Sequence, residues 1–399
     1  MISPLSSAAP VSPAPSRAVV PAVGLVQILN WGTTVYLPTV LAPPIAAETG
    51  WSLAFTVGGL SVGHLCAGAA SPFVGRAVDR LGGRPVLALA SGLIAAGLGL
   101  LSVAAEPVLY LLAWVVMGLG MGCGLYDAAF ATLGELYGAQ ARRPIGLVTL
   151  FGGLASTVSW PLSALLVDVM GWRGACLAYA AAHILLAVPL VLLALPRATA
   201  VRPSTTPDGE AEAPAPPRAR LLMLGAAICI GAAVTSLIAV HLLTLLRAGG
   251  LTAAAAVGLG ALVGPSQVGA RIVETVFGAR YHPLWAMLAS AGLAGTGLVL
   301  LNLGGPLAFA AIVLYGAGNG IWSITRGTVP LALFGPRRYA RIVGGLALPA
   351  LLASAAAPPL GAWVIETFGT GMTLAGLCAA SGLQLGLVAL LMRSALGRR

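Results

Sequence analysis

One arginine lies inside a long apolar stretch of the sequence, where a charged side chain is costly. The segment GPSQVGARIVETVFG, residues 264–278, contains Arg271 and, three residues later, Glu274. An arginine at the centre of a membrane costs roughly 2.5–3.5 kcal/mol, so one that is kept is expected to face the interior or a cavity. Its planar guanidinium suits a carboxylate ligand. Two structural interpretations stay open, an ion pair with Glu274 or snorkelling to the membrane surface.

Asp127 is the second ionisable residue well inside an apolar segment, GLGMGCGLYDAAFATL. Intramembrane carboxylates commonly mark proton relays, and Asp127 is therefore predicted to carry a coupling proton. In the alternative interpretation, neighbouring hydroxyls or Arg271 satisfy this carboxylate. His64 and His241 also fall in apolar segments, where each is either a proton relay or a packed, hydrogen-bonded side chain.

The composition indicates a protein that crosses a membrane many times. Of 399 residues, 58% are hydrophobic and 8% charged, against about 25% charged in a typical soluble domain. The net charge of +10 is interpreted as a topology signal, so no nucleic-acid partner is expected. The five cysteines lie in apolar segments without metal-ligand spacing. No catalytic triad, nucleotide loop or metal cluster is recognisable, so we expect neither an enzyme nor a cofactor.

Twelve apolar segments are long enough to span the membrane as helices. We predict an all-α membrane protein with a disordered tail (1–19), a first six-helix bundle (20–196), a flexible linker (197–220) and a second bundle (221–399). The spans are expected near 20–43, 52–74, 86–105, 108–131, 145–167, 174–195, 221–246, 252–277, 284–304, 306–328, 343–364 and 373–393. The tail shows no clear cleavage site, so no removed signal peptide is expected.

The arginines predict the orientation of these spans. There is no lysine, and if both termini are cytoplasmic, only Arg173 and Arg247 lie on the outer side, with Arg271 in a span. This bias fits the positive-inside rule. Richness in alanine, glycine and proline together with the missing lysine favours a bacterial source, hence the inner membrane of a bacterial cell. Nothing in the sequence requires more than a monomer.

A shift of 198 residues superimposes the two halves of the chain. It pairs landmarks over some 90 residues, namely Pro85 with Pro283, Gly118, Gly120 and Gly122 with Gly316, Gly318 and Gly320, Asp168 with Glu366, and Gly171 with Gly369. Two parallel six-helix repeats form a known transporter plan, with the substrate held near the midplane between them. The same shift pairs Asp127 with Thr325, so the second half lacks a matching acid.

The loop after the second predicted span resembles the signature of the major facilitator superfamily. The sequence GRAVDRLGGRPV supplies Gly75, Asp79, Arg80, Gly82 and Arg84, while Gly83 stands where a second basic residue is common. Gly75 is expected to permit close helix approach. In the family a carboxylate ending the fourth span pairs with this loop, and Glu135 occupies that place. These six residues are predicted to gate the cytoplasmic side.

One motif resembles the monocarboxylate transporter and oxalate–formate antiporter branch. It is LYGAQARRPIGLVTLFGGLAST, residues 136–157, although the branch's acidic–Gly–Trp motif before the first span is absent. The resemblance implies that Arg271 binds a substrate carboxylate, and a single intramembrane cation suits a monocarboxylate. Drug–proton antiporters match less well. The position of the arginine that they carry in span four falls near Trp114 in this sequence, and Trp160-Pro161 stands where they have a Gly-Pro-rich motif in span five.

The predicted function is secondary transport of a small organic monocarboxylate with a proton, by rocking of the two halves. The alternatives are a drug or metabolite efflux antiporter and a non-transporting receptor or assembly factor. The partners expected are the organic acid, the proton and the lipid bilayer. Further candidate substrate contacts are the polar and aromatic residues Asn30, Tyr36, Tyr126, Ser156, Asn319 and Trp322.

Overall fold

The computed structural model describes residues 16–137, 141–197, 217–334 and 336–396, all of which are helical or in short connections. In the first half the helices are α1 (Val19–Gly32), α2 (Leu37–Thr49), α3 (Leu53–Leu81), α4 (Gly83–Ser102), α5 (Pro107–Gly124), α6 (Tyr126–Tyr137), α7 (Arg142–Gly153), α8 (Ala155–Ala182), a π-helical turn (His183–Ala187) and α9 (Val188–Ala194). In the second half they are α10 (Arg218–Ala248), α11 (Ala253–Ala261), α12 (Val263–Phe277), α13 (Pro283–Leu303), α14 (Ala308–Phe334) and α15 (Pro336–Leu396), with 3₁₀ turns at Gly278–Arg280 and Gly305–Leu307. The predicted all-helical fold is confirmed.

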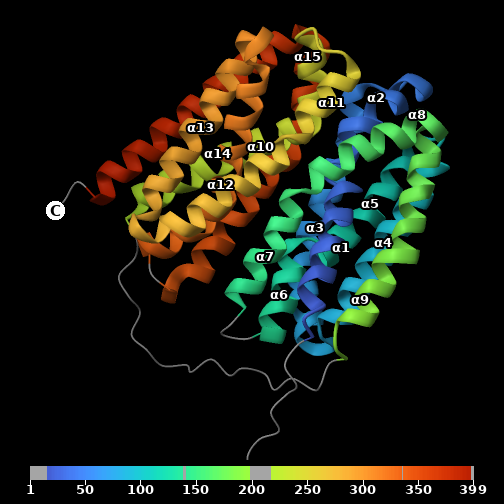
Figure 1. The fold of residues 1–399 in the computed structure, drawn as a ribbon, viewed down its shortest axis with the longest axis horizontal. Helices are drawn as coiled ribbons and strands as arrows, with labels where there is room; N and C mark the ends of the chain where they lie inside the picture. Colours follow the sequence, from blue (N-terminus) through green and yellow to red (C-terminus); the bar gives the residue numbers. More distant parts are fainter. Residues whose placement is uncertain (1–15, 138–140, 198–216, 335, 397–399) are drawn as a thin grey trace, which may run out of the picture.

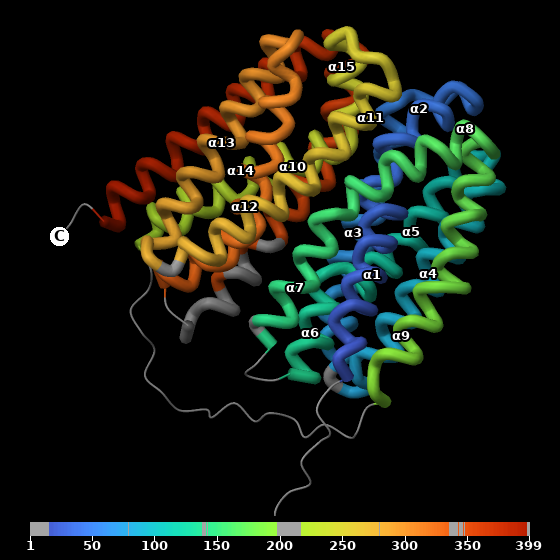
Figure 2. Tube along the Cα trace, in the orientation of Figure 1, coloured from blue at the N-terminus to red at the C-terminus, as the bar shows by residue number. Residues whose placement is uncertain are grey.

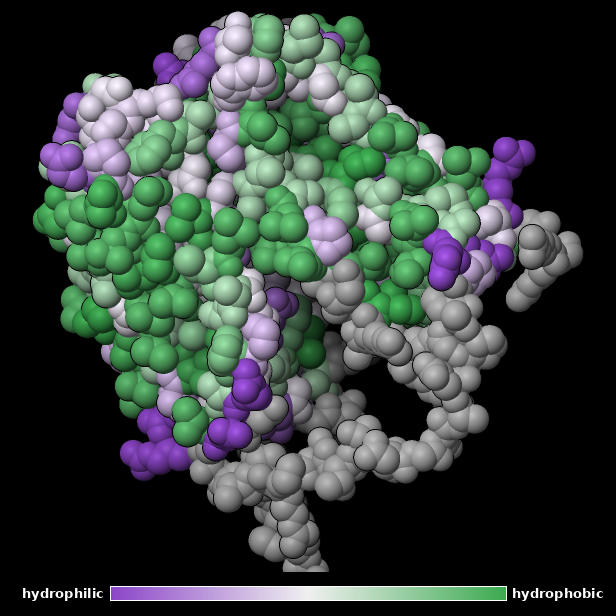
Figure 3. Space-filling view, turned by 180° about the vertical axis from the view of Figure 1, so that it is seen from behind, coloured by the Kyte–Doolittle hydropathy of each residue, from purple (hydrophilic) through white to green (hydrophobic). Residues whose placement is uncertain are grey.

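Helix α10 begins at Arg218, inside the segment 197–220 that was expected to be linker. Most of that segment and of the predicted tail lies outside the described residues. The two halves form two bundles side by side (Figure 1), with α1–α9 in one and α10–α15 in the other. Figure 3 shows a surface that is largely hydrophobic, with hydrophilic residues gathered toward its edges, as a lipid-facing protein requires.

Ten helical segments of the described chain are long and apolar enough to cross a membrane. Two of them, Arg143–Ala194 and Leu348–Leu396, contain 52 and 49 residues, more than twice the roughly 20 needed for one passage. Each is bent at a glycine with left-handed φ, Gly171 at +69° and Gly369 at +84°. Dividing both segments at these glycines accounts for the twelve predicted spans. Gly171 and Gly369 are also a pair that the 198-residue shift superimposes.

Paired glycines let the helices of each bundle approach closely. A Cβ added at any of these positions would meet a backbone carbonyl oxygen of a neighbouring span within 2.5–3.0 Å, so only glycine fits. The contacts are Gly118 with Gly63 and Gly120 with Ala90 in the first half, and Gly316 with Val263 and Gly318 with Ser290 in the second. The repeat seen in the sequence therefore corresponds to matching backbone contacts in the two bundles.

Leucine in place of Gly97 is expected to destabilise the first bundle. A Cβ at Gly97 on α4 would lie 2.3 Å from the Met117 side chain and 2.9 Å from the Ala113 carbonyl oxygen on α5. Overpacking of this kind costs about 1–3 kcal/mol. Gly99 on the same helix has no atom within 4 Å of such a Cβ, so Gly99→Leu is the control. Thermal unfolding in detergent should show a lower Tm for Gly97→Leu only; equal Tm values would mean that α4 and α5 are more loosely packed.

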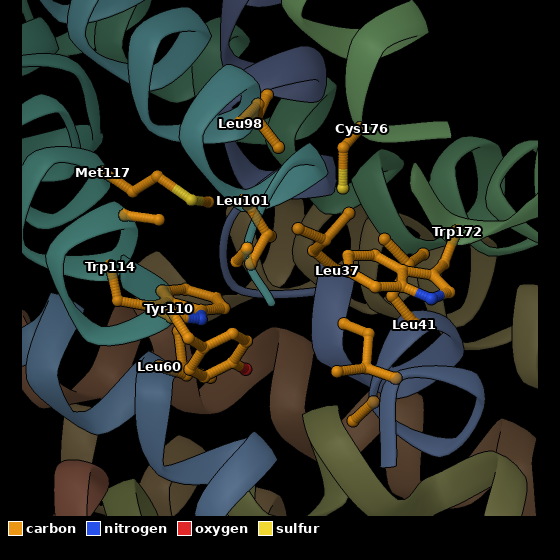
Figure 4. Packing of buried hydrophobic residues seen from close by; sticks show 14 of the residues in the cluster. Leu37, Leu41, Leu60, Leu98, Leu101, Tyr110, Trp114, Met117, Trp172 and Cys176 are labelled. Carbon is orange, nitrogen blue, oxygen red and sulfur yellow. The ribbon is translucent and has the colours of Figure 1, made fainter. Parts of the chain in front are cut away.

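Each bundle has its own apolar core, and each core receives one residue from the other half. In the first bundle Tyr110, Trp114 and Met117 pack with Leu98 and Leu101, each at most 1% exposed (Figure 4). Val240 of α10 joins this cluster, whereas Trp160 of α8 joins the core of the second bundle. The halves are therefore in direct apolar contact.

The two bundles meet along α3 and α15, which lie side by side (Figure 2). The Leu53 amide donates to Glu366 Oε1 at 2.7 Å, and the Ser61 hydroxyl donates to the Ala355 carbonyl. Leu53 begins α3, at the end of the molecule opposite to the one where α9 ends and α10 begins. At this far end a carboxylate of one half thus caps a helix N-terminus of the other.

Removal of the Glu366 carboxylate should make the contact between the N-terminus of α3 and the second half open more often. Glu366→Ala leaves the Leu53 amide without its carboxylate, and a lost N-terminal cap costs about 1 kcal/mol, or roughly fivefold in an opening equilibrium. We expect hydrogen exchange of the first turn of α3 to accelerate by about that factor. Asp168, the partner of Glu366 in the repeat, has no cross-half hydrogen bond among the described residues, so Asp168→Ala is the control. Unchanged exchange in Glu366→Ala would show that the cap does not hold the halves together.

Candidate functional site

Arg271 is buried between the two halves, 6% exposed, on α12. Its Nη1 donates to the Thr149 carbonyl oxygen on α7 at 2.5 Å, and its Nε donates to the Gly320 carbonyl oxygen on α14 at 3.4 Å. Its Nη2 donates to Gln267 Oε1 at 3.3 Å, one turn back on the same helix. One guanidinium therefore links an element of the first half to two elements of the second.

The charge of Arg271 has no carboxylate partner within the described part of the chain. Its three acceptors are neutral, whereas Arg173 near the far end pairs with Glu48 at 2.9 Å. Glu274 is half-buried, and its carboxylate lies beside Gly278, where an added Cβ would come within 2.3 Å of Oε1. The ion pair with Glu274 considered from the sequence is not formed. Snorkelling is also wrong, because the guanidinium stays inside the protein.

Helix interruptions surround this arginine. Within span four, predicted near 108–131 and found at Pro107–Tyr137, α5 ends at Gly124, Leu125 is extended with ψ −170°, and α6 begins at Tyr126. The glycines of GMGCG favour such a break because they cost a helix more conformational entropy than alanine does. Span eight is interrupted between α11 and α12, just before Gly264-Pro265, since proline cannot donate the helical hydrogen bond.

Two amides of α1 satisfy the backbone that the break in span four exposes. Gln27 Nε2 and Asn30 Nδ2 donate to the Gly124 carbonyl oxygen at 2.7 and 2.8 Å. Trp31 Nε1 donates to Gln27 Oε1 at 3.1 Å, so these three residues form one network. Asn30 Oδ1 is buried without a partner in the described structure, and this oxygen is the atom that a ligand can still use.

Tyr126 lies beside Arg271, and Tyr36 is connected to Tyr126 through the Trp31 ring. The Tyr126 hydroxyl donates to the Thr149 carbonyl oxygen at 3.5 Å, the same acceptor that Arg271 uses. The Ser156 hydroxyl is fully buried, also without a described partner. Of the residues proposed from the sequence as substrate contacts, Tyr126 and Tyr36 thus lie on the first-half side of this interface.

The two candidates of α14 have partners of their own. Asn319 Oδ1 accepts a hydrogen bond from the Thr235 hydroxyl at 3.1 Å, and Asn319 precedes Gly320, whose carbonyl binds Arg271. Trp322 is 7% exposed and packs over Gly231 of α10, in an apolar cluster with Leu224. The geometry gives Trp322 a packing role and leaves Asn319 beside the arginine.

Asp127 occupies the first turn of α6 next to Tyr126, and its side chain is exposed. Neither Arg271 nor any other described basic group lies within ion-pair distance of it. His241 bonds to the Pro358 carbonyl oxygen at 2.8 Å, whereas His64 Nδ1 is buried without a described partner. The Asp127 carboxylate therefore lies on the surface of span four, whereas a backbone hydrogen bond fixes the His241 ring.

The signature loop after α3 is built around two glycines. Gly82 has φ +78°, and the Gly83 amide donates to Glu135 Oε2 at 3.1 Å. A Cβ at Gly83 would lie 2.1 Å from Thr132, which explains why no second basic residue stands there. Arg84 Nη2 donates to the Leu192 carbonyl oxygen at 2.6 Å.

The close helix approach expected at Gly75 is wrong for this conformation. Nothing lies within 4 Å of a Cβ at Gly75, because this stretch of α3 buries only Val74 and Val78. Arg80 is exposed, and the side chain of Asp79 lies outside the described part of the structure.

The sequence interpretation missed Gln267, Thr149 and Arg326. Gln267 was detectable, since it is a polar residue four positions before Arg271 on the same face of an apolar helix. Thr149 takes part through its backbone carbonyl, which every residue carries. Arg326 is exposed on α14, and its charge reaches Tyr126.

Two helical bundles joined in parallel, with a buried cation and broken helices where they meet, define a secondary transporter. The Major Facilitator Superfamily model matches residues 23–344. The chain belongs to the Major Facilitator Superfamily, whose members are transporters and not enzymes. The predicted family and the predicted absence of enzymatic activity are confirmed.

The chain is similar to known proteins in sequence and to solved structures in fold. Human Monocarboxylate transporter 11 is 30% identical over 329 residues, which cover 75% of this chain and 67% of that protein. An uncharacterized 38 kDa protein of Thermoproteus tenax is 34% identical over 179 residues, about half of each chain, at 45% and 47%. Among solved structures, the nucleoside transporter NupG superimposes with a TM-score of 0.76 at 13% identity, covering 94% of this chain and 98% of that one. A POT family transporter in complex with a thioalcohol conjugated peptide follows at 0.73, also 13% identical, covering 94% and 96%.

Proposed function

We propose that the protein moves a small organic monocarboxylate across the membrane together with a proton. The observation that carries this proposal is the buried Arg271 guanidinium, which has only neutral acceptors in the described structure. A buried charge without a counter-charge is unfavourable, and an anionic ligand relieves that cost. The similarity to a human monocarboxylate transporter supports the same ligand class.

The position of Arg271 also supports a mechanism of alternating access. The guanidinium holds the Thr149 carbonyl of the first half and the Gly320 carbonyl of the second. A carboxylate that binds the fork in a bidentate manner competes with these carbonyls for the same donors. Ligand binding and the contact between the halves are therefore linked, as a transporter that rocks between two states requires.

The number of fixed cations favours one carboxylate over two. Arg271 is buried, whereas Arg326 is exposed on the surface of α14. Asp127 is assigned the proton, because it is an ionisable side chain at the surface of span four and its repeat counterpart Thr325 cannot ionise. Predominantly cytoplasmic arginines place both termini on the inner side of a bacterial cell membrane in this proposal.

A ligand panel on the purified protein tests the proposal. Small mono- and dicarboxylates, amino acids, sugars and cationic drugs are compared by thermal stability at pH 5.5 and 7.5. A ligand at 100 times its Kd adds about 2.7 kcal/mol, so monocarboxylates are expected to raise the Tm. Uptake of the same acid into proteoliposomes then shows transport.

Other outcomes overturn specific parts of the proposal. Stabilisation by cationic drugs alone would indicate an efflux protein. Tighter binding of dicarboxylates would add Arg326 as a second anion contact. Binding of an acid without flux would indicate a receptor.

A further inference from the structure

Five aromatic side chains form a connected group at the interface of the halves, which we call the aromatic cluster: Trp31, Tyr36, Tyr126, Phe130 and Trp160. Trp31 lies 4.9 Å from Tyr126 between ring centroids, and Tyr126 stacks on Phe130 at 5.0 Å. Tyr36 lies 6.3 Å from Trp31 and meets Trp160 edge-on at 5.6 Å. The rings come from spans one, four and five, so the cluster is assembled only when these helices pack.

The cluster ends at the arginine. The Tyr126 hydroxyl and Arg271 Nη1 donate to the same Thr149 carbonyl oxygen, at 3.5 and 2.5 Å. Tyr126 in turn contacts Trp31, whose ring lies 6.3 Å from that of Tyr36. A carboxylate that reaches the guanidinium therefore brings the rest of its molecule beside these rings.

The cluster differs from a finished apolar core. Tyr110 and Trp114, which pack inside the first bundle, are each 1% exposed. Trp31, Tyr36, Tyr126 and Phe130 all keep part of their surface accessible, whereas Trp160 is 1% exposed and anchors the cluster to the core of the second bundle. Trp160 Nε1, in the cluster, and Asn30 Oδ1, next to Trp31 in the chain, are buried without partners in the described structure, although buried polar atoms are nearly always paired. Open ring surface and unused polar atoms together indicate a ligand site.

We propose that the organic acid bound by this protein carries an aromatic group. This inference rests on the proposed function. The aromatic group packs in the aromatic cluster while the carboxylate of the same molecule binds Arg271. Aromatic rings attract one another in offset and edge-on arrangements with centroids 4.5–7 Å apart, the spacing that the cluster already shows. An aliphatic group of the same volume gains the apolar contact but lacks this ring–ring attraction.

Three simple acids test the proposal on the wild-type protein: benzoate, cyclohexanecarboxylate and acetate. Ring–ring attraction predicts that the Kd of benzoate is about threefold to tenfold lower than that of cyclohexanecarboxylate, which has a similar volume. Acetate, which leaves the rings uncovered, is expected to bind more weakly than both. The Kd values are measured by calorimetry in detergent.

Variants of Trp31 locate the effect. Trp31→Leu should bring the benzoate and cyclohexanecarboxylate Kd values within twofold of each other, while Trp31→Phe keeps a ring and should keep the preference. Equal binding of benzoate and cyclohexanecarboxylate to the wild-type protein would overturn the aromatic assignment but leave the proposed function intact if both need Arg271. Failure of all three acids to bind a folded protein would overturn both.

Discussion

Arg271→Lys is expected to lower carboxylate affinity by about 10- to 150-fold and to reduce uptake at low substrate concentration to the same extent. Lysine keeps the charge but replaces a planar fork by one point donor on a flexible stem. It cannot reproduce the bidentate pair of hydrogen bonds that the guanidinium offers a carboxylate. The loss of one or two charge-assisted hydrogen bonds, about 1.5–3 kcal/mol, sets the range. Calorimetry gives the affinity and proteoliposome uptake gives the transport rate.

Two further variants separate a binding role from a structural one. Gln267→Leu removes the acceptor of Arg271 Nη2 but keeps the guanidinium charge. We expect it to weaken carboxylate binding by less than Arg271→Lys does. Arg280→Gln removes an exposed arginine that lies over the Phe277 ring just after the same helix, and should leave affinity unchanged. If folded Arg271→Lys bound and moved the acid like the wild type, the guanidinium would serve only to join the halves.

The sequence predicted the structure best at positions where only one type of residue satisfies the local physical requirement. Gly171 and Gly369 were paired by the repeat, and both are bends where a left-handed φ favours glycine. The depth of Arg271 in an apolar stretch predicted its burial, because an arginine facing lipid would be costly. Both conclusions depend on composition and spacing, which a sequence displays directly.

The break between Gly124 and Leu125 shows where such inference ends. The hydrophobic run is continuous through span four, and several glycines offer equally good places for an interruption. What stabilises this particular place is the pair of amides from Gln27 and Asn30, which lie 97 and 94 residues away. Because the partner group is a backbone carbonyl, no pattern of side chains predicts the contact.

Asp127→Asn is expected to uncouple uptake from the proton gradient. With one proton moved per acid, a pH difference of one unit supports about tenfold accumulation, since one unit corresponds to 1.36 kcal/mol. Asparagine cannot carry that proton, so the accumulation ratio should fall to about one. Exchange of labelled for unlabelled acid needs no net proton movement and should continue. Proteoliposomes with and without an imposed pH gradient measure both rates.

The exposure of Asp127 makes this test specific. The carboxylate pairs with no described arginine, so the amide breaks no ion pair, and the fold should tolerate the change. Glu106→Gln, at an exposed acid that immediately precedes span four, is the control and should keep wild-type accumulation. Accumulation that survives in Asp127→Asn would move the proton to another group. His64 is then the next residue to replace, because its Nδ1 is buried with no partner in the described structure.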